Sequence, residues 1–455
     1  MSVAAAPPPP RPARAERFAY LGFDVDERAG TLRCRYRLDD RELAELVVVA
    51  PGRSWPEEAF EAARLVHLLA GVSYYKVGAA RTIELGDAVL RPGDRDLLDS
   101  FYRSGLGEFA HRNGLSLHDV EIVGGRDEPA RAPAPARPAL ERPLVPFGGG
   151  IDSFVTVDAV TRVTNDAALF VANRRGDRFA AIERAAEATG LPVVRAEREI
   201  DPFVLRPPDP AAVFNGHVPI TGILSAVAVL AAVLDGRDAV VMSNEWSASK
   251  GNLVVDGEVV NHQWSKGDAF EEAFRRALAG ALGGSVDYFS FLRPFSELWV
   301  ARRFAALQRF HPVVHSCNRA FHLDPARRLD RWCGRCDKCC FIDLILGPFV
   351  PAAALVALFG GTEPLADPTL LAPFRALVGL GDERKPFECV GDVDECRTAV
   401  VLAADRADRA GNPVLGALLA EMGPAAVAAA RDAAGPLGRP LSPHHIPDVL
   451  AAALG

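Results

Sequence analysis

Residues 144–153 read Leu-Val-Pro-Phe-Gly-Gly-Gly-Ile-Asp-Ser, and this stretch decides the fold that the sequence predicts. Leu144 to Phe147 can end a buried strand, and the three glycines that follow let the backbone turn sharply and approach a ligand closely. A helix is predicted over Val155 to Val163, and the unpaired backbone N–H groups at its start can bind an anion. The stretch therefore predicts a phosphate-binding loop formed by Gly148, Gly149, Gly150, Asp152 and Ser153.

Two common phosphate-binding motifs do not fit this loop. The Walker motif requires a lysine after its last glycine, and the dinucleotide fingerprint requires Gly-x-Gly-x-x-Gly. The loop is close to the Ser-Gly-Gly-x-Asp-Ser sequence of the PP-loop ATP pyrophosphatases, which split ATP into AMP and pyrophosphate. Gly148 replaces the first serine, and Pro146 lacks the N–H that a central strand uses. On these residues alone, an ordinary glycine-rich turn remains the alternative.

Beyond the loop, predicted strands and helices alternate. The strands are expected at 168–172, 192–196 and 239–243, and the helices at 179–189 and 220–234. This alternation predicts an α/β fold with a central parallel sheet that is covered on both faces. Ligands of such sheets bind at the carboxyl ends of the strands. We therefore expect the glycine loop, Asn173 to Arg175 and Ser243 to Glu245 to line one crevice.

Composition divides the rest of the chain. Residues 1–16 are rich in Pro, Ala and Arg and are predicted to be a disordered leader. Strands at 18–25 and 31–36 and helices at 56–69 and 95–113 predict a small α+β N-terminal domain over 17–125. Residues 126–143 are predicted to be a semi-rigid Pro/Ala linker. The PP-loop domain would then occupy 144–348, and a helical C-terminal region 349–455.

Length and charge exclude several classes of protein. The chain has 455 residues, 49% of them hydrophobic, and a net charge of −8, which disfavours a generic nucleic-acid binder. Its longest apolar stretch, residues 220–234, is too short to span a bilayer, so no membrane partner is predicted. No export signal is evident, which indicates a cytoplasmic protein whose cysteines stay reduced or bind metal.

Cysteine spacing predicts a metal site. The run Cys333-Gly-Arg-Cys336-Asp-Lys-Cys339-Cys340 repeats a thiol at two-residue intervals, and one more cysteine precedes it. Four thiolates close a structural zinc site, and an iron–sulfur cluster or a redox pair are the alternatives. The predicted ligands are Cys317, Cys333, Cys336 and Cys339, with Cys340 as a substitute. Cys34, Cys389 and Cys396 have no ligand spacing and are expected to be ordinary buried or half-buried thiols.

The loop and the cysteines together resemble the PP-loop branch that includes 7-cyano-7-deazaguanine synthase and the tRNA-thiolating enzymes. Polar segments at 215–219, 243–249 and 261–266, with Glu-Cys-Val-Gly at 388–391, are more similar to another relative. On these segments the chain resembles the ATP-dependent UDP-N-acetylmuramoyl-L-alanyl-L-glutamate epimerases of bacterial cell-wall synthesis, over roughly residues 18–400. Ile151 stands where a lysine is expected in this family.

The resemblance implies that the terminal L-glutamate of UDP-MurNAc-L-Ala-L-Glu is epimerised, with release of AMP and pyrophosphate. Converting a carboxylate to an acyl-adenylate removes its charge and makes the neighbouring α-proton removable. Asp152 would help to hold Mg²⁺ at the phosphates of ATP, Ser153 would donate to them, and the cysteines would hold a structural Zn²⁺. The acid–base candidates are His217, Glu245, Lys250, His262 and Lys266, although a lone histidine is often only a hydrogen-bond partner.

Two other classes of function remain open on the sequence. One is a PP-loop enzyme that adenylates a tRNA base or a deazapurine for sulfur or nitrogen transfer. The other is a scaffold that binds nucleotide and zinc without catalysis. A group of basic residues near the cysteines would bind RNA phosphates in the first case and a substrate diphosphate in an epimerase, or would simply be a solvated face. These residues are Arg319, Arg327, Arg328, Arg331, Arg335 and Lys338.

Overall fold

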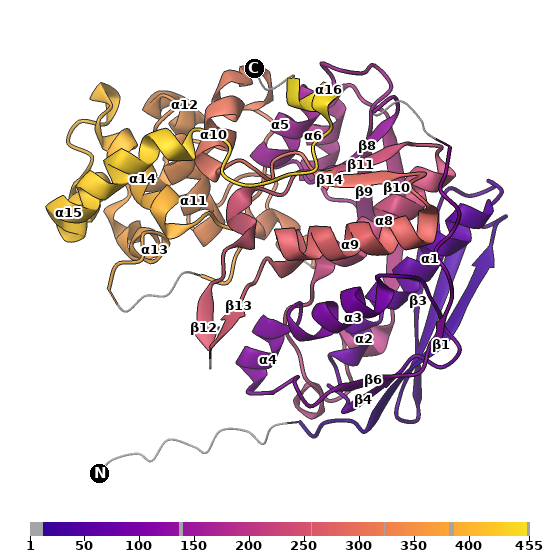
Figure 1. Cartoon of the computed structure of the whole chain (residues 1–455). Coiled ribbons are helices and arrows are strands. Elements are labelled where there is room, and N and C mark those ends of the chain that lie inside the picture. Colours follow the sequence, from indigo (N-terminus) through magenta and orange to yellow (C-terminus); the bar gives the residue numbers. More distant parts are fainter. Residues whose placement is uncertain (1–11, 136–139, 256, 323, 382–385, 453–455) are drawn as a thin grey trace, which may run out of the picture.

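The computed structural model describes residues 12–135, 140–255, 257–322, 324–381 and 386–452. A mixed α/β architecture surrounds one large, mostly parallel sheet (Figure 1). Its strand order is β14-β11-β8-β9-β10-β3-β2-β1-β4-β6. Within this sheet, among the residues described, only the pairings β10–β3, β3–β2 and β2–β1 are antiparallel. The predicted α/β class is confirmed, but the sheet that was expected to be parallel is mixed, with mostly parallel pairings.

Five strands build the half of the sheet that carries the glycine loop. They are β8 (Pro143–Pro146), β9 (Ala168–Arg174), β10 (Val193–Ile200), β11 (Ala239–Met242) and β14 (Asp287–Ser290). The chain adds β9 and β10 on one side of β8, and later adds β11 and β14 on the other. This reversal of strand order opens a crevice at the carboxyl ends of β8 and β11, where doubly wound folds bind their ligands.

Helices cover both faces of this half because alternate strand residues point to opposite sides. Val145 joins the core beneath α5 (Ile151–Val160), α6 (Ala180–Thr189) and α10 (Glu297–Ala306). Its neighbour Leu144 joins the core beneath α1 (Glu57–Ala70), α8 (Ile220–Leu234) and α9 (Asp268–Leu282). All four strand residues of β11 are buried, as expected for a parallel strand covered twice.

The N-terminal strands continue the same sheet. They are β1 (Arg17–Asp26), β2 (Thr31–Leu38), β3 (Arg41–Val49), β4 (Thr82–Glu84) and β6 (Glu121–Val123). At the junction, β3 pairs with β10, and the buried pair Glu45 and Arg198 connects them with a 2.5 Å ion contact. The linker after this N-terminal part contacts α9. The backbone amide of Arg131 donates to a carbonyl within α9, and that of Ala134 donates to the carbonyl of the C-cap residue of this helix. Residues 17–125 therefore share a core with the glycine-loop half.

Two local expectations need correction. The helix expected at 95–113 is two helices, α3 (Asp94–Arg103) and α4 (Gly107–Asn113), with Gly105 between them. Residues 12–16 of the expected leader are packed: the amide of Ala15 donates to the carbonyl of Gly78. Residues 1–11 lie outside the described residues. Strand β3 was not among the expected elements, while the helix expected at 220–234 is confirmed as α8.

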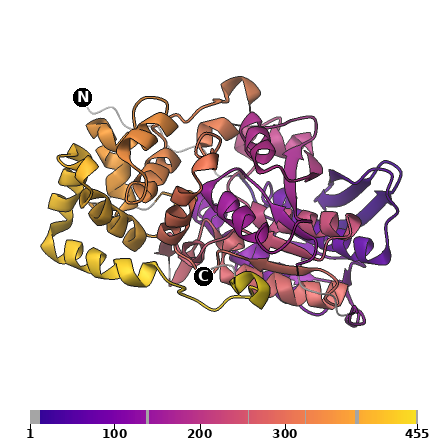
Figure 2. The same ribbon diagram turned by 90° about the horizontal axis from the view of Figure 1, so that it is seen from above.

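Helices of the C-terminal region gather at the opposite end of the molecule from β1–β3 (Figure 2). They are α12 (Ala352–Leu358), α13 (Leu371–Leu377), α14 (Val393–Ala404) and α15 (Pro413–Leu437), and α11 (Asp337–Leu346) comes directly before them in the chain. By length and composition α15 could cross a membrane. Gly423, with φ of 73°, breaks it into two shorter helices, and α15 packs on α14. Neither part reaches the ~20 residues that a membrane span needs.

Short elements complete the fold. They are α2 (Val72–Tyr75), α7 (Pro202–Leu205), α16 (Asp448–Ala451), β5 (Val89–Leu90), β7 (Arg126–Asp127), β12 (Leu253–Val255) and β13 (Glu258–Val260). The hairpin β12–β13 lies beside α4 (Figure 1). It therefore brings the polar segment that follows it, at 261–266, close to the N-terminal part of the chain.

Candidate active site and metal centre

The glycine loop lies between β8 and α5 at the crevice. Gly149 has a φ of +78°, which favours glycine, and a Cβ there would lie 3.2 Å from the Cβ of Ala185. The amide of His315 donates to the carbonyl of Gly149 at 2.9 Å and fixes the turn. Ser153 accepts a hydrogen bond from the amide of Gly148 at 3.3 Å. The loop is thus held open in front of the N-terminus of α5, an arrangement suited to an anion.

A cavity of about 160 Å³ adjoins this loop. It is smaller than the ~300 Å³ at which small-molecule sites usually begin, so it suits phosphates and a carboxylate rather than a whole nucleotide. A cavity of about 370 Å³ lies at the start of β11 and β14, which is the wrong end of a parallel sheet for ligand binding. The smaller cavity is lined by Gly148, Gly150, Ile151, Asp152, Ser153, Glu245, Lys266, Glu297, Ser316, Lys338, Ile342 and Cys389.

Two lysines from distant segments supply positive charge to the cavity. At position 151, where a lysine was expected, the side chain is an isoleucine buried in the core, so this position supplies no positive charge. Lys266 follows the hairpin β12–β13, and Lys338 is the second residue of α11. Burial alone would lower the pKa of Lys266, but the charges of Cys389, Glu245 and other acids raise it above its ordinary value. Lys266 is therefore an ammonium group facing the site at neutral pH.

Acidic side chains line the cavity, and in the described part of the chain buried polar atoms without partners lie at the ends of nearby strands. Asp152, Glu245 and Glu297 line the cavity, and burial followed by the charge of Glu245 raises the pKa of Glu297 well above its ordinary value. Among the residues described, Ser316 Oγ is buried without a hydrogen-bond partner, as are polar oxygens of Asn173 and Ser243 at the ends of β9 and β11. Buried polar atoms normally have partners, so these are consistent with a polar ligand.

Two histidines and a glutamate form a second polar cluster. The ring centroids of His217 and His262 lie 4.2 Å apart, and Nδ1 of His262 lies 2.5 Å from Oε2 of Glu108. Burial lowers the pKa of His217 to about 4, aided by the charge of His262. Burial also opposes protonation of His262, but contacts with Cys389 and Glu108 raise its pKa to about 9. One histidine is therefore neutral and the other charged at pH 7.

Sequence reasoning missed Glu108 because it lies at the start of α4, far from any recognised motif. Its pKa is lowered: burial would raise it, but the hydrogen bond from His262 and the nearby charges outweigh burial. Lys76 also comes from the N-terminal part, and its Nζ donates to the carbonyl of Gly216 at 3.2 Å. The N-terminal part of the chain therefore contributes side chains beside the predicted site. No pattern in 17–125 indicated this.

Cys389 differs from the ordinary thiol that the sequence predicts. It lines the cavity, and Nζ of Lys266 donates to its sulfur at 3.4 Å. Nζ of Lys338 donates to its backbone carbonyl. Burial raises the pKa of this thiol, but Lys266, His262 and Lys338 together lower it to about 7. The available signal was its place in the Glu-Cys-Val-Gly segment at 388–391.

The structure brings together most of the predicted acid–base candidates. Glu245 and Lys266 line the cavity, and His262 contacts both Cys389 and His217. Lys250 does not join them: it is exposed, and its Nζ lies 4.4 Å from the ring centre of Trp246. The geometry therefore favours four of the five candidates by position.

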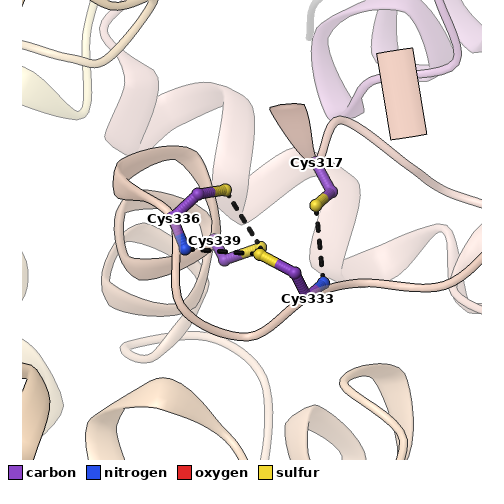
Figure 3. A group of neighbouring side chains, drawn as sticks. All are labelled: Cys317, Cys333, Cys336 and Cys339. Atoms are coloured by element: carbon purple, nitrogen blue, oxygen red, sulfur yellow. Dashed lines mark hydrogen bonds between the residues drawn. The ribbon is translucent and has the colours of Figure 1, made fainter. Parts of the chain in front are cut away.

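The four predicted cysteine ligands converge on one point (Figure 3). The sulfurs of Cys317, Cys333, Cys336 and Cys339 all lie within 4.8 Å of one another. Within the group, Sγ of Cys339 is 3.7 Å from that of Cys333 and 3.5 Å from that of Cys336. The amide of Cys336 donates to the sulfur of Cys333 at 3.3 Å, and a helix begins just after Cys336, which favours thiolates. Four such thiolates fit a tetrahedral zinc ion.

Two residues of the four-cysteine group are sequence neighbours of residues that line the cavity. Cys317 follows Ser316, which lines the cavity, and Cys339 follows Lys338, which reaches Cys389. Cys340 lies in the hydrophobic core and outside the group of four. Of the basic residues near the cysteines, Arg328 is paired with Asp177 at 2.6 Å and is not free for a phosphate. A metal here would fix the start of α11 and thereby Lys338.

Comparison with known proteins identifies the family of the chain. The MurL N-terminal domain model matches residues 10–291, and the MurL C-terminal domain model matches residues 313–433. Three relatives are named UDP-N-acetyl-alpha-D-muramoyl-L-alanyl-L-glutamate epimerase. That of a Micromonospora species is 40% identical over 97% of this chain and 98% of its own length. Those of Xanthomonas oryzae pv. oryzae and Salinispora tropica are 41% and 39% identical, covering 86% and 89% of either chain. This chain therefore belongs to the MurL family.

Proposed function

We propose that this protein epimerises the terminal L-glutamate of UDP-MurNAc-L-Ala-L-Glu to D-glutamate at the expense of ATP, in the synthesis of peptidoglycan precursors. The names of its relatives support the substrate and the reaction. The observation that carries the ATP dependence is the cavity in which the glycine loop meets Lys266 and Lys338. We expect the reaction to take place in the cytoplasm, because ATP is available in that compartment.

The residues at the loop fit the triphosphate of ATP. The amides at the start of α5 and the ammonium groups of Lys266 and Lys338 offer positive charge to phosphates. Asp152 would hold Mg²⁺, which bridges and neutralises phosphate oxygens when bound. The polar oxygens of Asn173 and Ser243 offer further contacts along the crevice. Transfer of AMP from ATP to the substrate carboxylate would release pyrophosphate and leave an uncharged acyl group.

Adenylation would make the next step feasible. With the carboxylate charge removed, the carbonyl can accept the electron pair that remains when the α-proton leaves. Epimerisation then requires one group to take a proton from one face and another group to deliver a proton to the other. Lys266 and His262 carry their protons at neutral pH because their pKa values are raised, so either could deliver a proton, while His217 is neutral and a weak base. Water finally releases AMP and the epimerised carboxylate.

One experiment tests this function. The protein is incubated with ATP, Mg²⁺ and UDP-MurNAc-L-Ala-L-Glu in deuterated water. We expect one deuterium at the glutamate α-carbon of the D-product and one AMP per turnover. AMP without exchange, or exchange without ATP, would refute the proposal.

A substitution in the glycine loop tests whether this loop is the site of adenylation. Asp152→Asn keeps the size of the side chain but removes its charge, so we expect AMP formation to fall by about 10²-fold or more. Asp96→Asn is the matched control, because it makes the same change at an exposed aspartate of α3 outside the cavity lining. Equal losses in both variants would show that the glycine loop is not the site of adenylation.

A further inference from the structure

Cys389 occupies a built environment that the acid–base candidates do not account for. Its sulfur receives a 3.4 Å hydrogen bond from Lys266, and its backbone carbonyl receives one from Lys338. Both lysines line the same cavity as Cys389 and Asp152 of the glycine loop. The thiol therefore faces the place where the phosphates and the substrate carboxylate are proposed to meet.

A histidine and a carboxylate continue from the thiol. The charge of His262 helps to lower the pKa of Cys389, and Nδ1 of His262 lies 2.5 Å from Oε2 of Glu108. A nucleophile or base, a histidine and an orienting acid in line are a recurring arrangement for activating a thiol. The carboxylate of Glu108 favours the imidazolium form of His262, and the imidazolium together with Lys266 favours the thiolate form of Cys389. The negative charge of the thiolate form of Cys389 is therefore stabilised by two neighbouring positive charges.

The acidity of the group agrees with this geometry. With a pKa of about 7, the thiol and thiolate forms of Cys389 coexist at neutral pH. Lys266 and Lys338 face it with positive charge, and Asp152, Glu245 and Glu297 line the same cavity. A group that must take and return protons at neutral pH works best when both of its forms are accessible.

We propose that Cys389 is the acid–base residue that exchanges the glutamate α-proton on one face of the activated substrate. This inference rests on the proposed function. In the step, the C–H bond breaks, its proton forms an S–H bond with the thiolate, and its electron pair moves into the activated carbonyl. The electron pair then returns to carbon and takes a proton on the opposite face from a second acid of the site. The thiol then returns its proton to solvent, and the second acid regains a proton from solvent, so both groups are restored for the next turnover.

The test compares Cys389→Ser with the wild-type protein and with Cys34→Ala. Cys34 is buried in β2, and its replacement leaves the cavity intact. With ATP, Mg²⁺ and the L-glutamyl substrate, we expect Cys389→Ser to retain substrate-dependent AMP and pyrophosphate release within a few-fold. Formation of the D-product should fall by about 10²–10⁴-fold. Cys34→Ala should retain both activities.

Three outcomes separate the alternatives. D-product within tenfold of wild type in Cys389→Ser would overturn the role of the thiol. Loss of AMP together with D-product, in a variant that melts like wild type, would also overturn it, because the thiol would then serve activation or binding. Absence of AMP from the wild-type reaction would instead refute the proposed function. If the serine variant fails to fold, the wild-type protein is alkylated with iodoacetamide, and modification of Cys389 is followed by the mass of its peptide. Formation of D-product must then fall in step with the modified fraction, while AMP release continues.

Discussion

Cys336 and Cys389 are both half-buried cysteines, yet their surroundings give them different chemistry. The neighbours of Cys336 are three more thiols, two of them within three residues along the chain. The neighbours of Cys389 are Lys266, His262 and Lys338, which come from other segments. The ligands of a metal centre can thus be recognised from their spacing along the chain, whereas an activated thiol depends on charged residues that only folding brings together.

The largest expected effect is on the metal centre. Cys336→Ala removes one of four ligands, so we expect loss of bound metal and destabilisation by more than about 4 kcal/mol. Metal analysis and thermal unfolding measure both. Cys340→Ala is the matched control, since it lies on the same helix but outside the group of four, and should keep one metal ion per chain. Iron and sulfide in place of zinc would contradict the zinc assignment.

The pair Glu108 and His262 should make stability depend on pH. The pKa of His262 is raised from 6.5 to about 9, so its stabilisation is fully present below pH 6.5 and is lost as pH rises through 9. In Glu108→Gln much of this contribution disappears, by at most ~3 kcal/mol. The difference in unfolding free energy between wild type and variant should therefore shrink from pH 6.5 to 9. A difference that stays constant over this window would contradict the pairing.

Lys266→Met should make Cys389 less reactive. The pKa of Cys389 is lowered from 9 to about 7 in part by Lys266, so removing that charge reduces the thiolate fraction at neutral pH. We expect alkylation of Cys389 by iodoacetamide at pH 7 to slow by about tenfold. The rate is followed on the Cys389 peptide by mass spectrometry. Lys250→Met, which changes a lysine outside the cavity, should leave the rate unchanged.

The smallest effect should be that of Cys389→Ser on stability. Cys389 is not in the group of four thiols and is only half-buried, so we expect a cost of about 1 kcal/mol and full metal content. Calorimetry and metal analysis on the purified variant measure these. Metal loss comparable to that of Cys336→Ala would show that the two cysteine environments are not independent.

Much of the fold could be predicted because it rests on local patterns. Helix α8 matches its apolar stretch, and the glycine loop follows a strand as the residue order requires. Strand β3 and its antiparallel pairing with β10 could not be predicted, because residues far apart in sequence meet there. The buried pair of Glu45 and Arg198 illustrates this: each is an ordinary charged strand residue until the two strands are adjacent.

The loop after β8 and the group of four cysteines could be predicted from the residue order alone, because short-range spacing constrains which backbone groups and sulfurs can meet one ion. The contacts of Glu108 with His262 and of Lys266 with Cys389 join residues that are far apart in the sequence, so they follow from the folded chain. These contacts set protonation states, and the pKa of a buried group depends on charges within a few ångströms in space rather than along the chain. For that reason the residue order could suggest acid–base candidates, but their protonation states follow only from the folded arrangement of distant segments around one cavity.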